Sequence, residues 1–204
     1  MVEFIVIGTT LGLSSGITPG PLLALVLSES LQHGVKAGVK VAVAPVLSDI
    51  PIVALTLYVL TKLSNFNAVL GIISFLGAVF LLFLGIENFR VKGLVLNHSN
   101  TASKSFTKGL VVNALNPHPY LFWLTIGAPI ANKALGQHPL SLPSFLAFFY
   151  ASFVSAKIIL AVLAGRYRLL ISDVLYKYIM WLLGIVLCLL ALVFFQDGLK
   201  LMHG

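Results

Sequence analysis

Six long apolar segments, each nearly free of charged residues, follow one another along the chain at about 4–27, 39–60, 67–89, 109–131, 143–165 and 174–196. Each is long enough to cross a bilayer as a helix, since roughly 20 helical residues span the hydrocarbon core. Membrane β-strands would instead alternate apolar and polar positions, whereas residues 187–195 are apolar throughout. The pattern predicts an all-α membrane protein with six transmembrane helices.

The composition leaves no room for a soluble domain of any size. Of the 204 residues, 59% are hydrophobic and only 9% are charged, whereas soluble domains carry about 25% charged residues. Such a chain cannot cover its surface with polar side chains. We expect residues 1–204 to form a single membrane domain surrounded by the lipid bilayer.

The basic residues concentrate in alternate connections between the apolar segments. Nine of them lie in the first, third and fifth connections: Lys36, Lys40, Arg90, Lys92, Lys104, Lys108, Arg166, Arg168 and Lys177. Only Lys62, Lys133 and Lys200 lie on the opposite side. Because cytoplasmic loops carry an excess of Lys and Arg, we predict a multi-pass protein of the cytoplasmic membrane with loops one, three and five inside and both termini outside. This topology accounts for the net charge of +7, so we expect no nucleic-acid partner.

A basic segment at about 92–108 divides the chain into two halves of three helices, at about 1–91 and 109–204. Thr18-Pro19-Gly20-Pro21 in the first half has a counterpart in the second, Asn116-Pro117-His118-Pro119, which lies 98 residues later. An odd number of crossings reverses the direction of the second half. We therefore predict two inverted repeats joined by a cytoplasmic loop, a plan common among secondary transporters.

The paired Pro-x-Pro motifs predict that the first and fourth helices are broken. Proline removes a backbone donor and clashes with the carbonyl one turn earlier, and backbone groups freed at membrane depth need protein or a watery cavity around them. The half-helix N-termini favour anionic groups and the freed carbonyls favour cations, so a zwitterionic amino acid suits both. Alternatively, the prolines only kink the helices. The candidate substrate-binding residues are Thr18, Pro19, Gly20, Pro21, Asn116, Pro117, His118 and Pro119.

Asp49 and Lys157 are the ionisable side chains deep inside the apolar segments, and a charge at that depth is costly and functional by default. Asp49 lies nine residues after Lys40. Lys157 lies nine residues before Arg166, so at 1.5 Å per residue both sit about 13 Å from the cytoplasmic face. Equal depth allows them to form an ion pair or to couple transport to an ion. Alternatively, Lys157 extends toward the cytoplasmic face and Asp49 bonds nearby backbone or Ser48, with no pairing.

Several of these motifs resemble those of the LysE (lysine exporter) type of amino-acid transporters. The most specific pieces are residues 16–21 (GITPGP), the glycines at 34 and 38, and residues 108–117 (KGLVVNALNP) followed by 121–123 (LFW). The chain departs from many relatives by having His118 and Pro119 after Asn-Pro, where those have a basic residue. The resemblance covers nearly the whole chain. It implies six helices, often in homo-oligomers, and secondary efflux of amino acids or related small solutes, driven by the proton gradient or the membrane potential.

Two other functions need to be weighed. Distant relatives of this type move metal ions, but Asp49 is the only acidic ligand at depth and no His or Cys cluster accompanies it. An intramembrane hydrolase would need a nucleophile beside a base such as His118, and no nucleophile motif is present. The single cysteine, Cys188, can form neither an internal disulfide nor a paired redox site. We expect no enzymatic activity, no cofactor and no bound metal.

Overall fold

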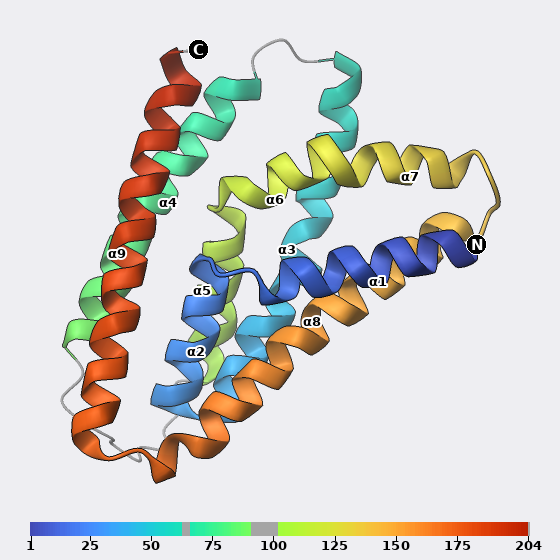
Figure 1. The fold of residues 1–204 in the computed structure, drawn as a ribbon. Helices are drawn as coiled ribbons and strands as arrows, with labels where there is room; N and C mark the ends of the chain where they lie inside the picture. Colours follow the sequence, from blue (N-terminus) through green and yellow to red (C-terminus); the bar gives the residue numbers. More distant parts are fainter. Residues whose placement is uncertain (63–65, 91–101, 204) are drawn as a thin grey trace.

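The computed structural model describes residues 1–62, 66–90 and 102–203, and every regular element in these ranges is helical (Figure 1). The elements are α1 (Val2–Ile17), α2 (Pro21–His33), α3 (Val35–Lys62), α4 (Phe66–Phe89), α5 (Ala102–Ala114), α6 (Pro117–Phe122), a π-helical turn η1 (Trp123–Gly127), α7 (Ala128–Leu135), α8 (Ser141–Tyr167), a 3-10 turn η2 (Arg168–Leu170) and α9 (Asp173–His203). The predicted helical class is confirmed.

Within the described residues, four helical stretches are long and apolar enough to span a membrane: Val35–Ala54, Ala68–Phe89, Ser141–Tyr167 and Asp173–Met202. The pair α1 and α2 makes a fifth candidate if its two parts, bent by 63°, count as one span. Large apolar side chains cover the outside of these helices, as Val79 (68% exposed) and Leu182 (60% exposed) illustrate. Lipid is the solvent that such surfaces require.

The apolar segment predicted at 109–131 is not one continuous helix. It is divided among α5, α6, η1 and α7, each too short to cross a bilayer alone. Pro117 begins α6, and Pro129 lies in the first turn of α7, where its missing N–H leaves the Thr125 carbonyl without its α-helical donor. The π-helical turn η1 lies just before this proline, and in it the Ala128 N–H donates to the Trp123 carbonyl oxygen five residues earlier.

The prediction of a basic loop at 92–108 is wrong for the last residues of that range. Residues 102–108 form the first half of α5, and residues 91–101 lie outside the described part of the chain. The polar residues there had suggested a loop, but α5 buries one side, including Ser105 and Gly109. Burial on that side, which sequence composition does not reveal, extends the helix.

Both helix breaks occur at the proline motifs. α1 ends at Ile17 and α2 begins at Pro21, whose ring fixes the first helical φ and whose missing N–H leaves the Ile17 carbonyl unpaired within the helix. The second break separates Ala114 from Pro117, and there the Asn116 side chain caps α6 by accepting the His118 N–H at 3.0 Å.

Close backbone packing holds the half-helices in place. α1 runs along α8 in the same direction (Figure 1), and a Cβ added at Gly8 would lie 2.6 Å from the Phe145 carbonyl oxygen. A Cβ at Gly16 would lie 2.8 Å from the Ala156 Cβ. Gly8 and Gly16 of α1 are thus contact points with α8, because only a residue without a side chain allows this approach.

α5 and α3 form a second pair that also runs in one direction. A Cβ at Gly109 of α5 would lie 2.9 Å from the Ala44 Cβ of α3, and one helical turn further on Asn113 reaches Asp49. α4 and α9 form the third pair, which lies along one side of the molecule in Figure 1. The pair is antiparallel, since Gly71 meets Gly198 and Gly85, further along α4, meets Gly184, which comes earlier on α9.

Candidate functional site

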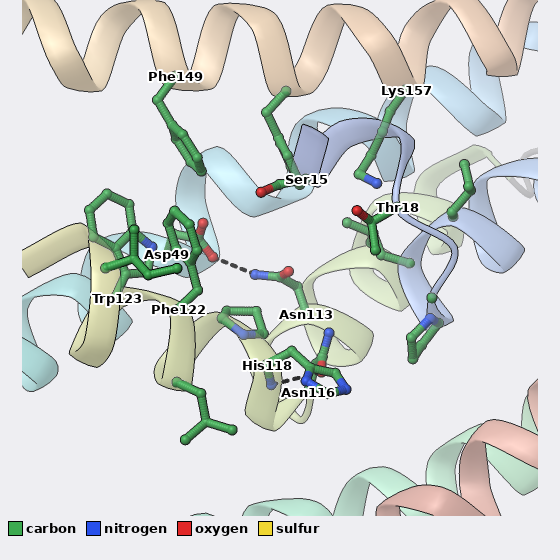
Figure 2. Close-up of a pocket in the computed structure, with 18 of the residues that line it drawn as sticks. Ser15, Thr18, Asp49, Asn113, Asn116, His118, Phe122, Trp123, Phe149 and Lys157 are labelled. Atoms are coloured by element: carbon green, nitrogen blue, oxygen red, sulfur yellow. Dashed lines mark hydrogen bonds between the residues drawn. The ribbon is translucent and has the colours of Figure 1, made fainter. Parts of the chain in front are cut away.

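A cavity of about 550 Å³ lies where the two helix breaks approach each other (Figure 2). Its lining comes from α1 and α2 with their connection, from α3, from α5 and α6 with their connection, from η1 and from α8. The lining residues are Ser15, Thr18, Pro19, Gly20, Pro21, Leu22, Leu23, Asp49, Asn113, Asn116, His118, Pro119, Leu121, Phe122, Trp123, Thr125, Ile126, Phe149, Phe153 and Lys157. The volume is in the range of small-molecule sites, about 300–1,000 Å³.

Every residue of the first proline motif, 18–21, lines this cavity. Thr18 caps the end of α1, where its hydroxyl donates to the Ser14 carbonyl oxygen at 2.7 Å. Gly20 has extended backbone and no neighbour within 4 Å of a would-be Cβ, so the chain here borders open space. The first motif therefore supplies exposed main chain to the cavity.

From the second motif, Asn116, His118 and Pro119 line the cavity, whereas Pro117 does not and is buried at the start of α6. The His118 ring packs edge-on against Phe194 with ring centroids 5.8 Å apart. Seven of the eight residues predicted from the two motifs thus line one cavity. Pro117 is the first residue of α6 and is buried outside the cavity lining.

Asp49 is buried in the cavity wall with 5% of its surface exposed. Its Oδ1 accepts from Asn113 Nδ2 at 2.6 Å and its Oδ2 accepts from the Tyr150 hydroxyl at 3.0 Å. Asn113 also donates to Ser48 Oγ at 2.8 Å. Both carboxylate oxygens are satisfied by neutral donors, so the geometry holds the group in place without neutralising its charge.

Lys157 lines the same cavity from α8 and is 2% exposed. Its ammonium donates to the Gly16 carbonyl oxygen at 3.0 Å and lies 4.7 Å from the centre of the Phe153 ring. In Figure 2 the ammonium points toward Thr18, and Asp49 lies on the other side of Asn113. The two charges do not form an ion pair in this structure; Lys157 instead caps α1 and Asp49 bonds to α5 and α8.

Aromatic rings form part of the cavity wall. Phe122 stacks on Phe149 with centroids 5.3 Å apart, and Phe149 stacks on Phe153 at 6.0 Å. The Trp123 ring meets Phe149 edge-on at 5.6 Å. The cavity is therefore largely apolar, with a few polar groups at fixed positions, as is usual for sites that bind small organic solutes.

Asn113 and Tyr150, the two residues that bond to Asp49, are among the site residues that sequence reasoning missed. Asn113 belongs to the segment 108–117 and precedes the second break by one turn, which was the available signal. Tyr150 lies in a run of aromatic residues on α8 and has no motif around it. Its role depends on how α8 packs against α3, which a single sequence does not specify.

A second buried charge, Glu29 of α2, lies just beyond the first apolar segment and was also missed; only 2% of it is exposed. Lys108 of α5 donates to Glu29 Oε1 at 3.0 Å and to Glu87 of α4 at 2.8 Å. Ser105 donates to Glu29 Oε2 at 2.6 Å. The charged Lys108 thus joins three helices.

A family model for the LysE type translocator matches residues 13–198, which is most of the chain. The chain belongs to the LysE type translocator family. Searches of curated proteins and of solved structures gave no match. The predicted resemblance is confirmed, and the apolar helices of this translocator are those of a multi-pass membrane transporter.

Two observations concern the side chains that the other two functions would need. Within the described residues, no group of three or more His, Cys, Asp or Glu side chains could hold a metal ion. No serine or threonine hydroxyl in that part of the chain bonds to the His118 side chain, whose ring contacts Phe194 instead.

Proposed function

We propose that this translocator exports amino acids or related small zwitterionic solutes across the cytoplasmic membrane by alternating access. The observation that carries the proposal is the single cavity at both helix breaks, into which a buried carboxylate, Asp49, and a buried ammonium, Lys157, are built. Paired breaks at a shared midplane site are the plan by which many secondary transporters bind substrate. A solute with one positive and one negative group matches the two charges.

The helix pairs support an inverted repeat of six spans. α1 packs along α8 as α5 packs along α3, so each first half-helix lies against the middle helix of the other half. The third helices, α4 and α9, pair with each other. In this arrangement α5 to α7 together form the fourth span, broken as α1 and α2 are broken.

Alternating access in this proposal is a rocking of the two halves around the cavity. The basic loops one, three and five are cytoplasmic by the positive-inside rule, which makes export the direction from that side. Asp49 is the residue that we propose takes up a proton or the substrate ammonium, because it is the acidic side chain of the cavity lining. The driving force is then the proton gradient or the membrane potential.

The experiment is efflux from proteoliposomes preloaded with each amino acid in turn, with and without an imposed proton gradient. We expect efflux of at least one amino acid faster than from protein-free liposomes, and acceleration by the gradient that a protonophore abolishes. Parallel vesicles loaded with divalent metal ions provide the comparison. If all amino acids were retained while a metal ion left the vesicles, the translocator would be a cation exporter instead.

A further inference from the structure

We propose that Lys157 is the receptor for the carboxylate of the transported substrate, which therefore lies with its carboxylate toward the α1–α2 break and its ammonium toward Asp49. This inference rests on the proposed function and deepens it. It assigns a role in substrate recognition to a side chain that sequence reasoning had linked only to Asp49.

The first argument is that the Lys157 charge has no counter-ion. All six acidic side chains of the chain lie in the described residues, namely Glu3, Glu29, Asp49, Glu87, Asp173 and Asp197, and none forms an ion pair with Lys157. The ion pairs that Glu3, Glu29 and Glu87 form in the described residues involve His33, Lys108 and Lys133. An uncompensated buried charge is costly, so an anion in the cavity would complete this site.

The second argument is the number of donors. A lysine ammonium has three N–H groups, and in the described structure its one hydrogen-bond acceptor is the neutral Gly16 carbonyl. The ammonium borders the cavity and points toward Thr18 (Figure 2). A carboxylate placed beside it would accept the remaining donors and form a charge-assisted hydrogen bond.

The third argument is the start of α2, which lies at the same side of the cavity. Its N-cap residue, Gly20, has no side chain, so no side-chain cap satisfies the first N–H groups. Leu22 and Leu23, whose N–H groups are among these free donors, line the cavity. A helix N-terminus favours negative charge and thus adds to the attraction that Lys157 provides.

The fourth argument is the balance of positive and negative charge in the cavity lining. Asp49 accepts from neutral groups, among them Asn113 and Tyr150, and forms no ion pair with a cation of the described residues. The cavity is therefore lined by one unneutralised charge of each sign. A zwitterion neutralises both, whereas an amine neutralises Asp49 alone and leaves Lys157 unpaired.

The competing interpretation is structural: Lys157 caps the C-terminal end of α1 through Gly16, and cations are favourable at that end of a helix. Under this interpretation the loss of Lys157 weakens the binding of every ligand alike. Under our proposal it weakens only ligands that carry a carboxylate. Lys157→Gln separates the two, because glutamine keeps an N–H donor for Gly16 but has no charge.

The test measures binding of neutral amino acids and of their C-terminal amides to the purified full-length protein by competitive equilibrium dialysis. The wild type should prefer each transported acid over its amide by about tenfold or more, the range of a hydrogen bond to a charged group. In Lys157→Gln the preference should fall to near one through weaker binding of the acid, with amide binding unchanged. Lys157→Arg, which keeps the charge, and the control Lys200→Gln on the exposed part of α9 should keep the preference.

An equal loss of acid and amide binding in folded Lys157→Gln, or an unchanged preference, would overturn the inference and leave the proposed function standing. If Lys157→Gln does not give a single size-exclusion peak, the Lys157→Arg variant is used instead. Folded Lys157→Arg protein that binds the acid and the amide equally well would overturn the inference. A wild type that neither binds nor exports any amino acid overturns the proposed function, and this inference with it.

Discussion

Replacing Asp49 with asparagine should stop efflux while leaving the protein folded in the membrane. Asparagine has the same shape and keeps an oxygen to accept from Asn113, so the contact between α3 and α5 survives. The negative charge that would hold a proton or a substrate ammonium is lost. We expect efflux to fall by about 10- to 100-fold, the value of a hydrogen bond to a charged group.

The measurement is initial efflux from proteoliposomes matched for protein content, with size-exclusion chromatography to check folding. Asp173→Asn is the matched control, because that carboxylate is exposed at the start of α9 and lies away from the cavity lining. Its efflux should equal that of the wild type. Ordinary efflux from Asp49→Asn would remove Asp49 from the transport mechanism.

Replacing Lys108 with methionine should cost about 3 kcal/mol or more of stability, because it leaves the buried Glu29 without its cation. Glu29 would keep only its hydrogen bond from Ser105 and its distant contact with His33. The double variant Lys108→Met with Glu29→Gln also removes the unpaired charge of Glu29, and it should recover much of the lost free energy of unfolding.

Denaturant unfolding in detergent, followed by circular dichroism, provides the free energies for this cycle. Lys133→Met is the control, because Lys133 pairs with Glu3 where both side chains are more than half exposed. Its effect should be much smaller, since exposed ion pairs contribute little. Additive losses in the Lys108 and Glu29 cycle would show that the two charges do not support each other.

The sequence predicted well what depends on local chemistry. Apolar length predicted the helices, and the missing N–H groups of Pro19, Pro21 and Pro117 predicted where two of them break. The residues of the two motifs, apart from Pro117, and the two intramembrane charges line one cavity.

The parts that were missed depend on packing between distant segments. Glu29 lies at the edge of an apolar segment, where a charge usually faces water, and is buried only because Lys108 and Ser105 come from α5. Likewise, Tyr150 reaches Asp49 only through the approach of α8 to α3. A single sequence contains no record of such pairings, so they could not be predicted from it.

The claim that substrate occupies the cavity between the two breaks is tested most directly by cysteine protection. Thr18→Cys in a Cys188→Ala background places the only thiol of the chain at an exposed position of the cavity lining. Its labelling by a maleimide should slow several-fold in the presence of saturating transported amino acid, whereas labelling of Ser172→Cys, exposed between η2 and α9, should not change. Labelling of Thr18→Cys at the same rate with and without a transported amino acid would contradict the account.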